Sequence, residues 1–299
     1  MTRLPVAISS QKLLERVTVC VPVGRVPLGK VFWVNHADTD NNGDGPGYGT
    51  LGNPFDTIAY AATKCAAGRG DLLLVMAGHT EAFASAVAGV IDVDDLTIMG
   101  VPQAGKLPTC TLTHADAVFS LAGDNMMLAN FRVVPDGTQA IVVELAGTHC
   151  RVSRLQIVSA SGALTSVLIT GDDAQVDHCV IQCTAAVANY GILIDDVARP
   201  VIRDNWIGDN FSVGAIYQLA GDNSPEAVIV RNIIYNRTAD KKAIGVQLGT
   251  SGVLGWNMGH VNDTVIAQVI ASVGTAECQN FFVGDDFTKA GALVGTPST

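Results

Sequence analysis

The sequence has few charged and few aromatic residues. Of its 299 residues, 15% are charged and 6% aromatic, whereas 48% are apolar. Despite this apolar content, no apolar run reaches the ~20 residues that a membrane-spanning helix needs, so we expect no membrane contact. The formal net charge of −10 argues against a nucleic-acid-binding protein. These properties predict a water-soluble chain that is long enough to bury a large core.

Paired cysteines are also lacking. The seven cysteines are odd in number and include no CxxC spacing, so the sequence suggests neither a disulfide framework nor a zinc site. We expect buried free thiols and no cofactor. The first twenty residues lack the apolar core and small-residue cleavage site of a secretory signal, which predicts synthesis and folding in a cytoplasm.

Basic residues gather at the N-terminus. Residues 1–30 carry five basic side chains against one acidic residue, Glu15. This arm is either an ordinary extension with some helix or a docking arm for another protein, with pairing to phosphates as a third interpretation. We expect it to precede a single domain over residues 31–299. The candidate docking residues are Arg3, Lys12, Arg16, Arg25 and Lys30.

A unit of about 25 residues recurs from residue 124 onward. Each copy carries a short apolar strand at a fixed position, and a second short apolar strand lies between successive copies. No amphipathic helix separates these strands, which excludes a doubly wound α/β sheet with its helical crossovers. The fourth positions of the copies, 23 to 27 residues apart, are Phe131, Leu155, Cys179, Asn205, Asn232, Asn257 and Asn280.

This repeat predicts a stack of coils. Each coil supplies two or three short strands, and like positions of neighbouring coils lie about 4.8 Å apart, as in any parallel ladder. The usual handedness of parallel crossovers makes the stack right-handed. We therefore expect an all-β, single-stranded, right-handed parallel β-helix with one capping helix near its N-terminus.

Two recurring polar columns are expected to be structural. Side-chain amides from Asn205 to Asn280 can hydrogen-bond along the stack when they lie one coil apart. Acidic pairs recur after the second strand of several coils, where Gly supplies unusual backbone angles and Asp caps its own turn. We expect a solvated acidic edge, with a cation site as the alternative. The pairs lie in residues 122–125, 170–173, 193–196 and 220–223.

Ahead of the repeats, residues 31–35 predict a strand, residues 56–67 a helix capped by Asp56, and residues 70–83 a strand and turn. A helix at this point would cover the open core and strand edge of the first coil.

The loop between the first strand and the helix is similar to half of a calcium loop. It has acidic or amide residues at the first, third, fifth and seventh positions, but Gly49 stands at the twelfth, where a bidentate Glu is needed. We expect no metal site, and weak cation binding stays open. The four residues are Asp38, Asp40, Asn42 and Asp44.

These N-terminal motifs resemble those of pectin-lyase-like right-handed β-helix proteins. Residues 53–61 are similar to the family's "PFxTIxxA" helix, and residues 70–78 to its "GDxVxVxxGxY" strand. The resemblance spans residues 31–285 and implies the fold rather than one activity. The family includes pectate lyases and polygalacturonases, and also bacteriophage tailspikes and other virion proteins. The missing secretory signal favours the phage members.

Because the family that the sequence resembles includes enzymes, we compare the sequence with the residues that their reactions require. A lyase would need aspartates that hold calcium near an arginine base, and a glycosidase two carboxylates about 5 to 9 Å apart. The "GHG" and "RIK" elements of polygalacturonases do not occur. We expect an exposed polar column rather than a catalytic groove, and therefore no enzyme. The residues that would form such a groove are Arg154, Arg203, Arg231, Asp177, His178 and Asp204.

One further column is unusual. The position after each fourth position should point outward because side chains alternate along a strand. It is polar in the first copies, at Arg132 and Gln156, and apolar in the last five. Such a stripe is either covered by loops or the C-terminal tail, or it mediates self-association, most simply as a trimer. The candidate stripe residues are Val180, Trp206, Ile233, Met258 and Phe281.

From these features we expect a structural protein of a phage particle, a capsid decoration or spike, assembled in the host cytoplasm. Its expected partners are copies of itself and other virion proteins such as the major capsid protein. The alternatives are a polysaccharide lyase or hydrolase and a non-catalytic carbohydrate-binding tailspike.

Overall fold

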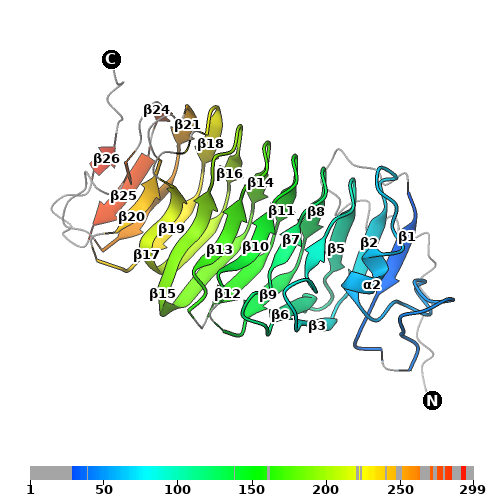
Figure 1. Ribbon diagram of the computed structural model, residues 1–299. Coiled ribbons are helices and arrows are strands. Elements are labelled where there is room, and N and C mark those ends of the chain that lie inside the picture. The colour runs from blue at the N-terminus through cyan, green and yellow to red at the C-terminus, as the bar shows by residue number, and fades with distance from the viewer. Residues whose placement is uncertain are drawn as a thin grey trace.

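The computed structural model describes residues 29–38, 40–137, 139–159, 162–219, 222, 224–239, 241–246, 251–262, 270–271, 275–278, 280–284 and 291–293. The fold is an all-β parallel solenoid, consistent with the predicted right-handed parallel β-helix. Its strands stack along one long axis from the N-terminal end, in blue, to the C-terminal end, in red (Figure 1).

One side of the solenoid is a ten-stranded sheet, here called sheet A. Each coil adds one short strand to it, and all neighbours are parallel. In spatial order the strands are β1 (Val31–Val34), β2 (Leu72–Met76), β5 (Thr97–Val101), β8 (Met127–Ala129), β11 (Arg151–Ser153), β14 (Gln175–Asp177), β16 (Val201–Arg203), β18 (Ala227–Val230), β21 (Gly252–Gly255) and β24 (Thr275–Cys278).

The remaining strands form a sixteen-stranded sheet, sheet B, with one main path and a side row. The main path contains β3 (Thr80–Phe83), β6 (Thr109–Leu112), β9 (Arg132–Pro135), β12 (Gln156–Ser159), β15 (Val180–Ile194), β17 (Trp206–Gln218), β19 (Ile233–Asn236), β22 (Met258–Val261), β25 (Asn280–Gly284) and β26 (Gly291–Leu293). The side row contains β4 (Val90–Ile91), β7 (Phe119–Leu121), β10 (Ile141–Leu145), β13 (Thr165–Ile169), β20 (Lys242–Gly245) and β23 (Ile270–Ala271). β15 and β17 are long enough to belong to both rows.

Single residues in the left-handed conformation turn the chain at two corners of the coil. This conformation costs a non-glycine residue roughly 1–2 kcal/mol, so its recurrence marks a turn that every coil must make. After sheet A, with φ between 54° and 61°, these residues are Asn130, Arg154, His178, Asp204, Arg231 and Trp256. Before sheet A, with φ between 55° and 59°, they are Asp95, Asn125, His149, Asp173, Arg199 and Glu226.

The residue after the first of these corners points into the solenoid, and the predicted asparagine ladder is confirmed there. The side-chain Nδ2 of Asn205, Asn232 and Asn257 each donates to the Oδ1 of the next asparagine at 3.0 Å. That Oδ1 also accepts the backbone N–H of the preceding asparagine, and each Nδ2 donates to a carbonyl of sheet A. All four asparagines, including Asn280, are buried. The ladder therefore satisfies polar groups that the corner would otherwise leave buried and unpaired.

The interior is a continuous apolar core from the capping helix to β25. In the first coils, the rings of Phe83 and Phe119 pack edge to face with centroids 5.2 Å apart, and Phe131 follows at 6.2 Å from Phe119. Fully burying one such side chain is worth about 1.5–3 kcal/mol. A core of this length makes the solenoid a stiff rod.

The N-terminal end of the rod is closed. Residues 49–55 run beside β1, where the Trp33 N–H donates to the Gly49 carbonyl at 3.1 Å and the Phe55 N–H donates to the Trp33 carbonyl at 2.8 Å. The helix α2 (Ile58–Ala62) buries Ile58, Ala61 and Ala62 against the first coil. These contacts pair the edge strand and cover the open core.

Two details of the predicted helix were wrong. It spans Ile58–Ala62 rather than residues 56–67, and its N-cap is Thr57, whose hydroxyl accepts from the Tyr60 N–H at 3.1 Å. Asp56 instead accepts from Asn42 and contacts His36. At the other end of the rod, β26 pairs antiparallel with β25.

Candidate functional site

The five predicted stripe residues occupy one column on the outer face of sheet B. Each lies in register with the next: Val180 with Trp206, Trp206 with Ile233, Ile233 with Met258, and Met258 with Phe281. They come from five successive strands, β15, β17, β19, β22 and β25. We call this column the apolar stripe.

The apolar stripe is open to solvent within the described part of the chain. The exposed fractions are 38% for Val180, 48% for Ile233, 51% for Met258 and 47% for Phe281. Alternation explains this, because the next residue on most of these strands points inward and is buried, as Ile234 and Phe282 are. β26 pairs with the edge of β25 and leaves Phe281 exposed.

Trp206 is half-buried, and its indole lies over Gly208 of the same strand. A Cβ placed on Gly208, two residues further along β17, would lie 2.3 Å from the ring. A glycine is therefore required beneath the indole, since any larger residue would push the ring away. The ring therefore extends the apolar surface of the stripe along β17 toward Gly208.

A second outward column beside the apolar stripe carries rings that sequence reasoning missed. Tyr235 and His260 are paired in register and stack with centroids 5.1 Å apart, and the guanidinium of Arg237 lies 5.2 Å from the Tyr235 centroid. Tyr235 and His260 each lie two residues after a stripe residue, so the alternation that located the stripe could have located them as well. The outer face of sheet B is thus broadly apolar and aromatic in its C-terminal half.

In the N-terminal half of the solenoid, the column that contains the apolar stripe is polar. Gln156 lies one coil before Val180 and Arg132 two coils before it, in the same register, and both are exposed. The apolar stripe therefore begins at β15 and covers only part of the solenoid.

Five of the six residues of the predicted polar groove contact one another as ion pairs: Asp177 with Arg203 and His178, and Asp204 with Arg231. Asp177, which is fully buried, pairs with the guanidinium groups of Arg151 and Arg203. Asp204 accepts two hydrogen bonds from Arg231, at 2.7 and 2.8 Å, and this contact lowers the pKa of its carboxyl. Both aspartates thus pair with arginines on neighbouring coils, an arrangement that stabilises a corner.

The acidic edge joins coils to one another. The carboxylates of Asp94, Asp124 and Asp172 each accept a backbone N–H from the next coil, at 2.7 to 2.9 Å. For Asp124 and Asp172 the prediction that the carboxylate caps its own turn was wrong, because each carboxylate reaches across one step of about 4.8 Å to the following turn. Within the described ranges, no group of three His, Cys, Asp or Glu side chains is placed to hold a metal ion.

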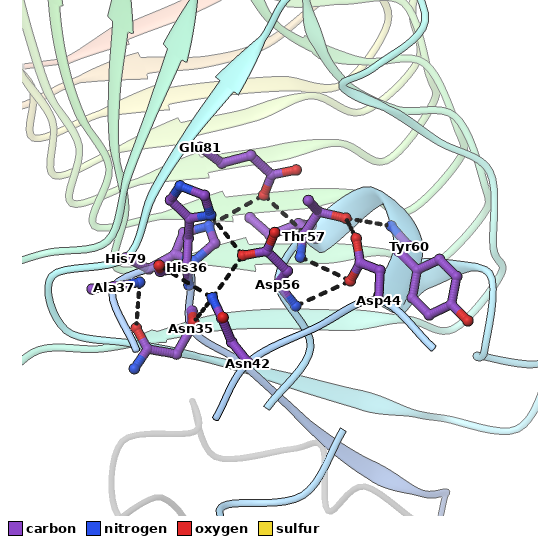
Figure 2. A network of polar contacts seen from close by, with 11 residues as sticks. Asn35, His36, Ala37, Asn42, Asp44, Asp56, Thr57, Tyr60, His79 and Glu81 are labelled. Carbon is purple, nitrogen blue, oxygen red and sulfur yellow. Dashed lines mark hydrogen bonds and ion pairs between the residues drawn. The ribbon is translucent and has the colours of Figure 1, made fainter. Parts of the chain in front are cut away.

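The loop with the calcium-like spacing ties the chain to the capping helix (Figure 2). Asp44 accepts the backbone N–H groups of Asp56 and Thr57 at 3.0 and 3.2 Å and the Thr57 hydroxyl at 2.7 Å. Asn42 donates to Asp56 at 2.7 Å. Asp38 also accepts from Nδ2 of Asn41 at 3.3 Å, so three of the four calcium-loop side chains contact the protein itself.

A buried polar pair lies beneath this loop (Figure 2). The His36 N–H donates to Nδ1 of His79 at 3.0 Å, so the other ring nitrogen of His79 carries the proton and donates to Glu81 at 3.1 Å. The same Glu81 oxygen accepts the Ile58 N–H at 2.8 Å, at the start of α2. The contacts of His79 and Glu81 are thus within the chain and serve the cap.

Of the predicted docking arm, Lys30 alone lies in the described part of the chain. Its side chain is exposed, and its backbone N–H donates to Asp71 at 2.7 Å. Arg3, Lys12, Arg16 and Arg25 lie outside the described residues.

Comparison with known proteins adds one structural likeness. No protein-family model and no curated protein sequence matches the chain. A solved structure named "Geobacillus virus E2 - ORF18" matches at 13% sequence identity with a TM-score of 0.38, over 95% of this chain and 65% of that one. The chain thus spans less than two thirds of that protein, and a likeness at this level carries no argument about function. No helix in the described ranges is long and apolar enough to cross a membrane.

Proposed function

We propose that this chain is a structural protein of a bacteriophage particle, a β-helix of the pectin-lyase type that associates side by side with copies of itself through the apolar stripe. The observation that carries this proposal is the exposed run of apolar side chains over five successive coils. Soluble monomers seldom leave such a surface uncovered. The similarity of residues 53–61 and 70–78 to a family that includes virion proteins supports the phage assignment.

A second copy of the chain fits the apolar stripe in register. Its coils have the same spacing of about 4.8 Å, so parallel copies bring each stripe residue against its own counterpart. The first end of the rod is closed by α2 and residues 49–55, which favours lateral association over stacking at that end. A trimer around an axis parallel to the rod is the simplest closed arrangement.

The proposed role is attachment rather than chemistry. Asp177 and Asp204 are paired with arginines, and a carboxylate held in this way is a poor general acid. Docking onto other virion proteins, such as the major capsid protein, is assigned to the basic residues at the start of the arm.

Sedimentation equilibrium tests the association. We expect the wild-type protein to sediment as an oligomer and the Ile233→Glu variant as a monomer with an unchanged thermal midpoint. Gln156→Glu changes the same outward column on a polar coil and is the matched control, which should remain oligomeric. A wild-type monomer at micromolar concentration, or an oligomer that Ile233→Glu leaves intact, would overturn the proposal.

The rings beside the stripe favour a second candidate, a non-catalytic carbohydrate-binding spike. The Trp206 indole lies over Gly208, and the ring of Tyr235 stacks on that of His260, which gathers aromatic rings of the kind that line ligand sites. Binding of a host polysaccharide without turnover, lost in Trp206→Ala, would support this candidate. Turnover of the polysaccharide would instead identify an enzyme and contradict both proposals.

A further inference from the structure

The outer face of sheet A is apolar at its first strands, β1, β2 and β5. Leu72, Leu74 and Met99 point away from the solenoid interior, since they alternate with the core residues Leu73 and Ile98. They are nevertheless only 0 to 1% exposed. The apolar residues that contact this outer cluster all come from the same three strands and are Val31, Trp33 and Val101.

Nearly complete burial of apolar residues at these outward positions is confined to the first coils, since the later outward valines Val201, Val228 and Val253 are only partly buried. Two strands further along sheet A, the outward positions in register with Met127 and Ala129 are Arg151 and Ser153, followed by Gln175 and Asp177. A buried apolar outer face thus extends from β1 to β8 and is interrupted by polar residues at β11 and β14. A sheet exposed to water on its outer side has no need of leucine and methionine there, so this part of the face is built to be covered.

The preceding residues of the chain start at this face. The backbone N–H of Gly29 donates to the Gly70 carbonyl at 3.2 Å, and that of Lys30 donates to Asp71, which directly precedes β2. The described part of the chain therefore begins beside the start of β1 and β2. Any strand that precedes it can fold back across the outer face.

The sequence before residue 28 has the pattern that such a cover needs. Residues 17–23 read VTVCVPV, with valine at every second position. In an extended chain these four valines lie on one side, and Thr18, Cys20 and Pro22 lie on the other. Pro22 lacks an N–H, which suits a segment that packs on a sheet face without joining its ladder.

We propose that residues 17–23 lie extended across the outer face of sheet A of their own chain, with the four valines on Leu72, Leu74 and Met99. Residues 24–28 span at most about 17 Å when extended, which is enough to cross the two strand spacings, about 10 Å, from β1 to β5. So short a connection favours the chain's own sheet over that of a second copy. We call residues 17–23 the strap.

The strap gives the two ends of the arm different roles. The valines fasten the arm to the first coils, and residues 1–16 with Arg3, Lys12 and Arg16 extend beyond it toward a partner. This inference does not depend on the apolar stripe, which lies on sheet B.

Charged substitutions on the two opposite sides of the strap test whether its valines cover the outer cluster. In a background with Trp206→Phe and Trp256→Phe, the single remaining tryptophan is Trp33 of the outer cluster. Val19→Asp with Val21→Asp puts two charges on the valine side, and we expect acrylamide quenching of Trp33 to rise at least twofold.

The matched control places the same charges on the other side of the strap, with Thr18→Asp and Cys20→Asp. It should leave the quenching of Trp33 unchanged. Equal quenching in the two variants, whether high or low, would overturn the proposal.

Cross-linking distinguishes the chain's own strap from that of a neighbour. Val21→Cys with Met99→Cys, in a Cys20→Ser and Cys278→Ser background, should form a disulfide within one chain that changes its mobility on a denaturing gel. A disulfide-linked dimer would show that the strap crosses to a second copy, and no disulfide would show that it lies elsewhere. Either result contradicts the proposal, and neither bears on whether the stripe mediates association.

The native thiols interfere little with this test. Burial raises the pKa of Cys65 and of Cys179 to about 12, so both remain protonated at the pH of thiol oxidation. Each single-cysteine variant serves as the control for its partner.

Discussion

The two halves of the solenoid distribute apolar and polar residues in opposite ways. In the first copies of the repeat, the inward corner position is apolar, as at Phe131 and Leu155, and the next residue faces solvent as Arg132 or Gln156. From Asn205 onward, the corner holds a buried amide and the next residue on the outside is apolar. The second half thus holds its corner together with hydrogen bonds and leaves apolar side chains for its surface.

This difference separates what folds the rod from what the rod presents. A corner filled by Phe131 is stabilised by burial of apolar area, whereas a corner filled by asparagine is stabilised only while every amide keeps its partners. The amide ladder repeats identically from coil to coil and keeps successive coils in register. The apolar stripe rests on these regular coils, which is what an interface between parallel copies requires.

The largest expected effect comes from breaking the ladder. Asn232→Leu leaves the Asn205 N–H and the Ile202 carbonyl buried without the partners they now have. Because each such group costs about 1–3 kcal/mol, we expect a loss of about 4 kcal/mol, measured as a lower midpoint in urea denaturation. Asn262→Leu, which removes one exposed hydrogen bond to Arg237, is the control and should cost under about 1 kcal/mol. Equal midpoints for the two variants would contradict a structural ladder.

The next largest effect is expected in the first half of the solenoid, where the carboxylate of Asp71 holds the first coils together. Burial alone would raise the pKa of Asp71, but hydrogen bonds from Arg69 and from the N–H groups of Ala66 and Lys30 outweigh it and lower that pKa. The stabilisation is therefore complete above the unfolded value of about 3.9 and is lost as the pH falls through the lower folded pKa. The asparagine ladder has no group that titrates there.

We therefore expect acid to loosen the first coils before the last. Pepsin digestion between pH 4 and pH 2, followed by mass spectrometry, should show cleavage around residues 29–72 first. Asp71→Asn should permit this cleavage already at pH 4 and cost about 2 kcal/mol at neutral pH. First cleavage within the asparagine-ladder coils would show that the clamp at Asp71 does not limit acid stability.

A smaller effect is expected where the two halves meet. Cys179 is the last apolar corner position, and its N–H already donates to Oδ1 of Asn205 at 2.9 Å. Cys179→Asn extends the ladder by one coil, and the new amide lies next to Asn205. We expect a change in the urea midpoint within about 1 kcal/mol, because a lost apolar contact is offset by a gained hydrogen bond. A loss as large as that of Asn232→Leu would mean that the halves are not interchangeable.

The smallest effect is expected from the exposed corner pairs. Arg231→Ala removes the pair with Asp204, whose arginine is half exposed, so we expect a loss below about 1 kcal/mol. The same substitution should raise the pKa of Asp204, which NMR titration of its carboxyl would detect. A larger loss of stability would mean that this exposed corner pair contributes as much to the free energy of unfolding as the asparagine ladder does.

Much of the fold could be predicted because its repeat is local in the sequence. The alternation around positions 131, 155, 179, 205, 232, 257 and 280 indicated the strands, the inward column and the outward stripe together. The stacking of asparagines followed from their spacing alone. These features depend on the residue's own strand, whose pattern is complete within one coil.

The features that could not be predicted depend on partners one coil or more away. Thr57 caps α2 because Asp44 from the preceding loop holds its N–H and hydroxyl, and nothing near Asp56 in the sequence indicates this. The carboxylate of Asp124 reaches the turn that follows it, which its own turn does not reveal. The apolar outer face of sheet A was missed because Leu72 to Val75 read as one buried strand, without an alternation that separates its two faces.

The most direct measurement of side-by-side association is cross-linking between identical stripe positions. Met258→Cys in the Cys20→Ser and Cys278→Ser background, treated with a short bis-maleimide, should give covalently linked dimers, because parallel copies in register place Met258 opposite itself. Gln156→Cys, on the polar coils of the same column, should give far fewer. Efficient linkage at position 156 with none at 258, or monomers alone at both positions in a folded protein, would contradict association through the apolar stripe.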